Sequence, residues 1–279
     1  MEAGVFSQVK YSIKKLLNID LNYYKEEQVK RRLDSWLVRN NMTDWFLYFE
    51  KISNNPEEKA RLRNYLTINV TEFFRDTQHW KTLEEKVLPL LISQAEARKS
   101  NIKIWSAGCS IGVEAYTVVI ALEEAVPRVH YEIFASDVDR GVLQKAKGRG
   151  PYVGEEIRNL SPMLKEKYLD KAEEKYYFKE KYTHSIRFFE QDLLLDKFTG
   201  GFDLIVCRNV VIYFTSEAKN MLYQKFWHAL RPGGVLFVGG TELLPRPSEY
   251  NFVSNWTSFY TKVQTCSSPA VVSKEEVKA

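Results

Sequence analysis

A glycine turn between an apolar run and a helical stretch is the place in this 279-residue chain whose residues best suit a ligand. The run IKIWSA (102–107) is followed by Gly108 and Gly112, and Glu114 then opens a helix with apolar spacing. Glycine at such a turn lets the backbone approach a nucleotide where a side chain would be in the way. The spacing G-x-x-x-G differs from the G-x-G-x-x-G that grips a pyrophosphate. We therefore expect a ligand with an adenosine but no phosphates, commonly S-adenosylmethionine; the alternative is a turn needed only for strand–helix packing.

Polar residues at the ends of later apolar runs favour the ligand. Asp137 closes the run ending in FASD, where a carboxylate accepts hydrogen bonds from both ribose hydroxyls. Asp192 stands at the end of the next run, where it is placed to meet an adenine amino group. Asn209 ends LIVCRN with an amide that both donates and accepts. Each signal is weak alone, but their order along the chain indicates a nucleotide-binding sheet.

The elements that must position these residues alternate between strand-like and helical patterns from residue 79 onward. This alternation is typical of an α/β fold with an open, mostly parallel, Rossmann-like sheet that is covered on both faces. Ligands of such sheets bind outside the carboxyl ends of the strands. The expected strands are 102–107, 131–137, 186–194, 202–209 and 234–240, with a closing run at 258–263. We expect the helix before the run 234–240 to end near Arg231, followed by a Pro-Gly-Gly turn.

Other segments do not follow this alternation. Residues 1–78 predict an N-terminal all-helical domain with helices at 6–17, 24–39, 45–51 and 57–67. Residues 148–186 are too long for a simple crossover and predict a small inserted subdomain within the sheet domain, 79–264. The tail 265–279 has little to pack, and we expect it to be disordered.

The composition argues against several functional classes. The chain has 40 Lys and Arg and 36 Asp and Glu, a formal net charge of +4, without the dense basic blocks of a dedicated nucleic-acid binder. Its three cysteines are odd in number and far apart, which argues against a disulfide framework and fits a reducing cytosol; we expect Cys109 and Cys207 to be small buried fillers. The four histidines lack metal-ligand spacing, so we expect no metal. No stretch reaches the ~20 apolar residues of a membrane helix, and the first residues do not resemble a signal peptide.

Five segments together resemble the chemotaxis receptor methyltransferases of the CheR type. They are NVTEFFRD (69–76), WSAGCSIGVEAYT (105–117), ASDVD (135–139), CRNVVIYF (207–214) and RPGGVLFVGGTE (231–242). The similarity runs from about residue 15 to residue 262, and the first and fourth segments are the most specific because general methyltransferases lack them.

The resemblance implies a cytoplasmic signal-transduction enzyme, a protein-glutamate O-methyltransferase. Such an enzyme transfers methyl from S-adenosylmethionine to glutamate side chains on the cytoplasmic helices of chemoreceptors, forming methyl esters and leaving S-adenosylhomocysteine. Carried over by motif, the cofactor contacts are Asn69, Thr71, Arg75, Glu114, Asp137, Asp192, Leu193, Asn209 and Val210. Arg75 and Tyr213 are implied to face the reacting centre as the catalytic residues.

Two departures from the family pattern affect these expectations. Family members usually carry G-E-E-P-Y in the glycine turn, whereas this chain has GVEAY, with Val113 and Ala115 in place of an acid and a proline. Glu114 is kept, so we expect cofactor binding to be kept, with a slightly looser helix start because proline pre-sets the first-turn backbone angle. Asp192 stands where asparagine is common, and an acid there accepts from an adenine amine but cannot donate.

Methyl transfer to a carboxylate needs no general base, because an ordinary glutamate has a pKa of about 4.3 and is ionised at neutral pH. The protein has only to align the reactants and exclude water. We expect Arg75 to hold the incoming carboxylate and Tyr213 to position the same oxygen. The alternatives are a surface ion pair of Arg75 with Glu72 or Asp76, and a packing role for Tyr213.

Two features bear on the receptor partner. Lys25, Arg32 and Arg39 recur every seven residues on one expected helix, so we expect this face to steer acidic receptor helices; the alternative is an ordinary solvated face. Some family members dock a peptide from the receptor C-terminus on a glycine-containing loop of the insert. Residues 155–199 contain no glycine, so we expect no dependence on that tether. We expect no nucleic-acid partner and no membrane insertion, and nothing demands more than a monomer.

Two other functions compete with this interpretation. A nucleic-acid methyltransferase predicts an N/D-P-P-Y/F-type loop to stack a flipped base, and the chain has CRNVVIY instead. A non-catalytic protein that binds S-adenosylmethionine or a receptor as a sensor is suggested by the altered GVEAY turn. Base-labile methyl esters on the receptor distinguish an enzyme from a sensor.

Overall fold

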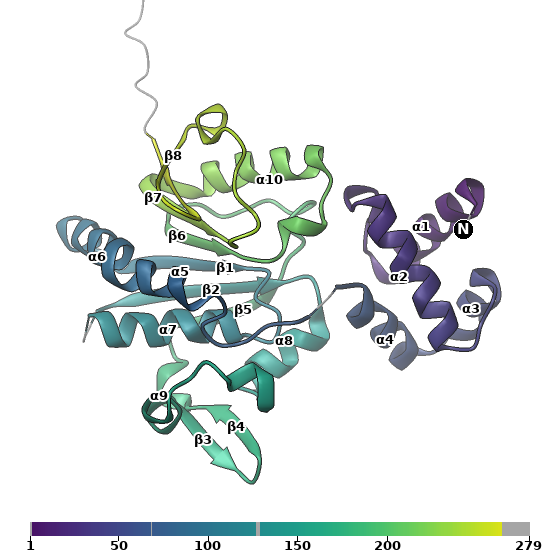
Figure 1. Ribbon diagram of the computed structural model, residues 1–279, viewed down its shortest axis with the longest axis horizontal. Coiled ribbons are helices and arrows are strands. Elements are labelled where there is room, and N and C mark those ends of the chain that lie inside the picture. Colours follow the sequence, from purple (N-terminus) through teal and green to yellow (C-terminus); the bar gives the residue numbers. More distant parts are fainter. Residues whose placement is uncertain (1, 68, 127–128, 264–279) are drawn as a thin grey trace, which may run out of the picture.

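The computed structural model describes residues 2–67, 69–126 and 129–263. Its N-terminal part contains α1 (Ala3–Leu17), α2 (Glu26–Arg39), α3 (Trp45–Ile52) and α4 (Pro56–Thr67), which lie to one side of the sheet (Figure 1). The Val29, Leu33 and Trp36 side chains form the buried stripe of α2 and pack in a common core with the other three helices. The N-terminal all-helical domain expected from the sequence is therefore present.

The remaining chain is built on one large sheet with the strand order β5-β2-β1-β6-β7-β9-β8. The strands β1 (Ile102–Ala107), β2 (Tyr131–Asp137), β5 (Ile186–Glu190), β6 (Phe202–Cys207) and β7 (Leu230–Val238) pair in parallel; β9 (Phe259–Lys262) pairs antiparallel with β7, and β8 (Phe252–Trp256) with β9. The helices that accompany the sheet are α5 (Thr77–Thr82), α6 (Leu88–Ala97), α7 (Val113–Ala125), α8 (Arg140–Lys147) and α10 (Ser216–Ala229).

Both faces of the sheet are buried. Successive residues of a strand point to opposite faces, so they enter different cores. Ile104 of β1 belongs to the core cluster that includes α7, and Trp105, the next residue, belongs to the cluster that includes Phe226 of α10. This two-sided burial confirms the predicted fold class.

The inserted segment lies below the sheet in Figure 1 and contains α9 (Pro162–Tyr168) and the hairpin β3 (Leu169–Ala172) with β4 (Lys175–Phe178). It packs on α7 through aromatic side chains. The Phe178 ring stacks on the Tyr116 ring with 4.2 Å between the ring centroids, and the Tyr168 hydroxyl donates a hydrogen bond to Glu124 at 2.6 Å. The domain limits expected from the sequence stay predictions, and the tail 265–279 lies outside the described residues.

The segment LRPGG (230–234) was predicted as the end of a helix and a turn, but it belongs to a strand. β7 already begins at Leu230, which pairs with Phe202, and the next pair is Leu204 with Val235. The intervening residues therefore form a bulge within the strand, where Gly233 takes a φ of +75°. The reason is tertiary, because the strand pairing at Leu230 draws the turn into the sheet.

Gly112 generates a prediction about stability. It precedes α7 with a φ of +85°, and a Cβ built on it would lie 2.8 Å from the Cβ of Ala146 in α8. We predict that Gly112→Ala lowers the free energy of unfolding by about 2–4 kcal/mol, through left-handed backbone strain and overpacking. Urea unfolding measures this loss. Gly4→Ala is the control, because no atom lies within 4 Å of the added Cβ; equal losses in the two variants would contradict the prediction.

Candidate active site

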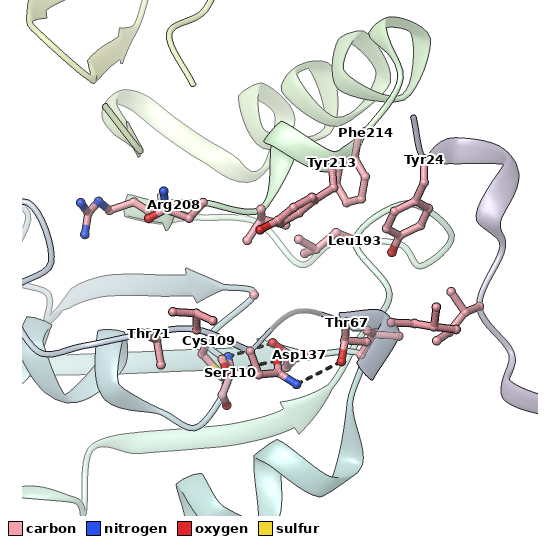
Figure 2. Close-up of a pocket in the computed structure, with 18 of the residues that line it drawn as sticks. Tyr24, Thr67, Thr71, Cys109, Ser110, Asp137, Leu193, Arg208, Tyr213 and Phe214 are labelled. Atoms are coloured by element: carbon pink, nitrogen blue, oxygen red, sulfur yellow. Dashed lines mark hydrogen bonds between the residues drawn. The ribbon is translucent and has the colours of Figure 1, made fainter. Parts of the chain in front are cut away.

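A large pocket lies at the carboxyl ends of the parallel strands, where the sheet domain meets the helical domain (Figure 2). It holds about 1430 Å³ of empty space, part of it open to solvent, which is ample for a small-molecule ligand of the usual pocket size. The structure brings all the residues expected at the site to its lining, namely Asn69, Thr71, Arg75, Glu114, Asp137, Asp192, Leu193, Asn209, Val210 and Tyr213. Their individual roles stay predictions.

The loop that follows β6 packs against the glycine turn. Gly108 has a φ of +83°, and a Cβ on it would lie 2.6 Å from Cγ2 of Val210. The sequence leaves open whether ligand approach or packing requires this glycine, and the structure shows that packing against Val210 already requires it. The turn and the β6 loop are therefore packed against each other at the pocket floor.

Asp137 ends β2 and presents a buried carboxylate to the pocket. One of its oxygens accepts a hydrogen bond from the Ser110 backbone N–H at 2.8 Å, and the other accepts from the Asp139 N–H at 3.0 Å. Burial raises the pKa of Asp137 to about 6, although these backbone bonds oppose the shift. Because a carboxylate oxygen accepts more than one hydrogen bond, both retain capacity for ligand hydroxyls.

The segment that joins the two domains is fastened to this floor. Asn69 donates to the Thr67 hydroxyl at 3.0 Å and accepts from the Ser110 hydroxyl at 3.2 Å. Thr67 in turn donates to the fully buried carboxylate of Asp139 at 3.1 Å. Figure 2 shows Thr67, Ser110 and Asp137 gathered on one side of the pocket. The connecting segment therefore forms part of the pocket wall.

Glu114 lies in the first turn of α7, and its carboxylate accepts from the Ser106 hydroxyl at 2.8 Å. Burial raises the pKa of Glu114 to about 7, and the positive charge of Arg208 is the strongest influence in the opposite direction. Arg208 also lines the pocket, but the sequence argument gave it no role. The only available signal was its position inside the CRNVVIYF segment.

Arg75 reaches the pocket without an ion pair to the acids beside it in sequence. Its guanidinium donates to the Val70 carbonyl at 2.9 Å. Glu72 pairs with Arg158 at 2.5 Å, and Asp76 pairs with Arg208 at 2.8 Å. The surface ion pair that the sequence left open for Arg75 is thus absent among the described residues.

Tyr213 lies on the opposite wall from Asp137, next to Phe214 and Tyr24 (Figure 2). It is half-buried, and burial raises the pKa of its phenol. The Tyr24 ring contacts Phe214 edge-on at 5.2 Å, and the Lys25 N–H donates to the Tyr213 carbonyl at 2.9 Å. A short backbone bridge thus fastens the helical domain beside Tyr213.

The helical domain contributes pocket residues that the sequence argument did not identify, including Tyr24, Gln28 and Arg32. The sequence predicts Arg32 on a basic outer face of the helix. It instead lies over the Tyr65 ring at 4.5 Å, donates to the Tyr65 carbonyl and lines the pocket. No periodic pattern marks a contact between two domains, so these residues carried no signal beyond the charge of Arg32.

The chain matches two family models over most of its length. Residues 69–259 match the CheR methyltransferase, SAM binding domain, and residues 5–67 match the CheR methyltransferase, all-alpha domain. The chain belongs to the CheR methyltransferase family. This CheR-family chain is thus an S-adenosylmethionine-dependent methyltransferase, and the resemblance stated from its motifs is confirmed.

Relatives of this CheR-family chain carry the name chemotaxis protein methyltransferase. The one from Listeria monocytogenes serovar 1/2a is 38% identical, over 90% of this chain and 94% of its own length. Those from Borreliella burgdorferi and Escherichia coli K12 are 35% and 31% identical, over 81% and 85% of this chain and 83% of their own lengths. The family assignment favours an enzyme over the non-catalytic sensor.

The residues at the CheR pocket suit an adenosine with a cationic methionine part. The carboxylates of Asp137 and Glu114 line the pocket and suit hydroxyl donors and positive charge. The buried Nε of Arg208 has no hydrogen-bond partner among the described residues, and its N–H suits the carboxylate of the methionine part. Cys109 and Cys207 are buried, and burial raises the pKa of both thiols, so neither suits nucleophilic attack.

Among residues 2–67, 69–126 and 129–263, no three His, Cys, Asp or Glu side chains gather as a metal site. None of the helices in the same ranges has the length and apolar character to cross a membrane. The expectation that this CheR-family enzyme needs no metal stays a prediction.

The raised pKa of Glu114 predicts that the stability of the enzyme depends on pH. Its pKa of about 7 in the folded protein exceeds the ordinary 4.5, so between these values the folded state binds a proton that the unfolded state has lost. Glu114 therefore costs stability above about pH 7, and this cost disappears as the pH falls toward 4.5. We predict that Glu114→Gln raises the free energy of unfolding of the ligand-free enzyme at about pH 8 and has little effect at about pH 4.5.

Urea unfolding at several pH values measures this difference. Glu50→Gln, at an exposed position in α3, is the control for the loss of a surface carboxylate. A Glu114→Gln variant whose stability follows that of the unsubstituted enzyme at every pH would contradict the buried, proton-binding carboxyl.

Proposed function

We propose that this enzyme methylates glutamate side chains on the cytoplasmic helices of chemoreceptors, forming glutamate methyl esters in the cytoplasm. The observation that carries the proposal is the meeting of Arg75 and Tyr213 with the carboxylates Asp137 and Glu114 in one pocket. The family assignment and the names of the relatives support a chemotaxis substrate.

S-adenosylmethionine, when bound, supplies a methyl group on a sulfonium. We assign its ribose hydroxyls to Asp137, whose oxygens each keep acceptor capacity. Asp192 uses Oδ1 to accept from the Leu194 and Leu195 N–H groups at 2.8 and 3.2 Å. Its Oδ2 has no partner among the described residues and is assigned to the adenine amine. Leu193 and Val210 also line the pocket and are assigned to the same end of the ligand.

The reaction that the residues support is an in-line displacement. A substrate carboxylate oxygen bonds to the methyl carbon, the carbon–sulfur bond breaks, and its electron pair stays on sulfur, so no proton moves. Arg75 holds the carboxylate before the reaction. Because the carboxylate loses its charge in the transition state, a tight grip would stabilise the ground state and slow the step. The single bond from Arg75 to the Val70 carbonyl leaves donors free for a moderate hold.

Tyr213 and its neighbours are assigned to alignment and to the exclusion of water. The Tyr213 ring forms the wall opposite Asp137, and the contact between Tyr24 and Phe214 closes the pocket on the side of the helical domain (Figure 2). Excluding water and fixing the reactants are the main ways in which a site without a general base accelerates transfer.

The receptor is assigned to the face of α2 that is open to solvent. Lys25, Arg31 and Arg39 are exposed there, while Arg32 of the same helix lines the pocket. An acidic receptor helix attracted to this face would therefore lie beside the pocket mouth. We propose that the enzyme works as a monomer, with neither nucleic acid nor membrane insertion.

The insert is assigned no tether function. Its hairpin turns through Glu173, which takes a φ of +55°, a conformation that favours glycine, and residues 155–199 contain none. We propose that the enzyme does not depend on a peptide from the receptor C-terminus. A calorimetric titration with such a peptide should detect no saturable binding, and saturable binding to the insert would refute this.

The methyl-ester assay tests the proposed function. With labelled S-adenosylmethionine and receptor cytoplasmic fragments, we predict label on the receptor that mild base releases. Asp137→Asn should weaken S-adenosylhomocysteine binding by about 10–100-fold, because a hydrogen bond to a charged group contributes about 1.5–3 kcal/mol. Asp170→Asn, at an exposed position in β3, is the control. Unlabelled receptor, or label that resists base, would contradict the proposal.

The basic face of α2 has a prediction of its own. Replacing Arg31 and Arg39 together by Glu should lower kcat/KM for the receptor by about tenfold at low salt, because opposite charge speeds encounter. The effect should shrink at about 1 M salt, where the Debye length falls to about 3 Å. Lys51→Glu at the end of α3 is the control for charge reversal elsewhere. A salt-independent loss, or a matching loss in cofactor affinity, would argue against steering.

A further inference from the structure

Arg208 is a buried guanidinium to which neither the motifs nor the proposed function gives a task. Only 6% of its surface is exposed. It lies over the Trp80 ring at 5.4 Å and over the Phe237 ring at 4.9 Å, one ring from the α5 region and one from β7. A charge in such surroundings is costly unless it is paired, so its partners indicate what it is for.

One nitrogen of Arg208 holds the residues around Arg75. Its Nη2 donates to the Arg75 carbonyl and to the Asp76 carboxylate, each at 2.8 Å. The Trp80 indole N–H donates to the same Arg75 carbonyl at 2.9 Å. The backbone of Arg75 is therefore fixed from two sides by buried groups.

The turn that carries Arg75 needs such support. Phe74 and Asp76, the residues on either side of Arg75, have φ values of +50° and +58°. This left-handed region is unfavourable for residues other than glycine, and strained residues of this kind persist only where their surroundings hold them. Without the bonds from Arg208, the strained turn would relax more easily, and Arg75 would be held less firmly in the pocket.

Arg208 lines the same pocket as a second group at the site, Glu114. The groups around that carboxylate are the positive Arg208 and Arg75, the negative Glu242, and the Ser106 hydroxyl, which donates to it at 2.8 Å. Among these charges Arg208 has the largest effect in favour of the ionised carboxylate. Arg208 therefore connects the two groups that are assigned to the cofactor and to the reacting centre.

We propose that Arg208 is a positioning residue of the methyl-transfer site: it holds the strained turn that presents Arg75, and it balances the charge of Glu114. The proposal rests on the proposed function, since both tasks matter only if the pocket takes S-adenosylmethionine. A purely structural ion pair would contribute to folding alone.

Two substitutions separate the two tasks. Arg208→Lys keeps the charge but loses the planar fork. It should keep the pH profile of S-adenosylhomocysteine binding and lower kcat for methyl transfer at least about tenfold, since the Arg75 turn loses its hold. Arg208→Gln removes the charge as well. It should weaken S-adenosylhomocysteine binding at least about tenfold at neutral pH, and the pH below which affinity falls should move upward, because Glu114 is then harder to ionise.

Calorimetry with S-adenosylhomocysteine between about pH 6 and pH 8.5, together with kcat and KM on receptor fragments, gives these readouts. Arg98→Gln is the matched control, because Arg98 pairs with buried Asp203 near the start of β6, at the opposite edge of the sheet. It should lower the free energy of unfolding and leave ligand affinity and its pH profile unchanged.

The outcomes separate this proposal from the function on which it rests. An unsubstituted enzyme that binds no S-adenosylhomocysteine would overturn both. Binding by the unsubstituted enzyme, with Arg208→Gln equal to it in affinity and pH profile, would overturn only the task at Glu114. If Arg208→Gln does not fold, Arg208→Lys decides the task at Arg75: an unchanged kcat overturns it, and a lowered kcat at unchanged stability supports it.

Discussion

The burial of two carboxylates at the carboxyl edge of the sheet is the constraint on which the rest of the site depends. Asp137 and Glu114 both have pKa values raised by desolvation, so the ligand-free protein holds them at a cost. Such a cost is repaid when a ligand brings hydroxyl donors and positive charge to the same place. Backbone N–H groups around Asp137 and the guanidinium of Arg208 limit the cost until then.

The second property of the site is that two domains build it. The bridge between Tyr24 and Phe214 and the bond from Thr67 to Asp139 fasten the helical domain to both sides of the pocket. A receptor segment docked on α2, as proposed, would therefore lie within reach of the residues assigned to the cofactor. Because Arg32 belongs to both the basic helix and the pocket lining, the proposed receptor docking and the methyl transfer would share this side chain.

Much of this architecture could be predicted from the sequence. Alternating strands and helices indicate a parallel sheet, and the carboxyl ends of such strands meet at one edge, which is why Asp137, Asp192 and Asn209 were expected together. The bulge in β7 was missed because Leu230 joins the strand through pairing with Phe202, a tertiary contact. Arg208 was missed because an arginine carries no local sign of burial. Gly108 was identified, but its reason, the contact with Val210, depends on two distant segments.

The structure of the complex with S-adenosylhomocysteine tests the central claim most directly. The account predicts the ribose hydroxyls within hydrogen-bond distance of the Asp137 carboxylate, and the sulfur between Arg75 and Tyr213. A ligand seated away from Asp137, or a sulfur turned from Arg75 toward the bulk of the protein, would contradict it.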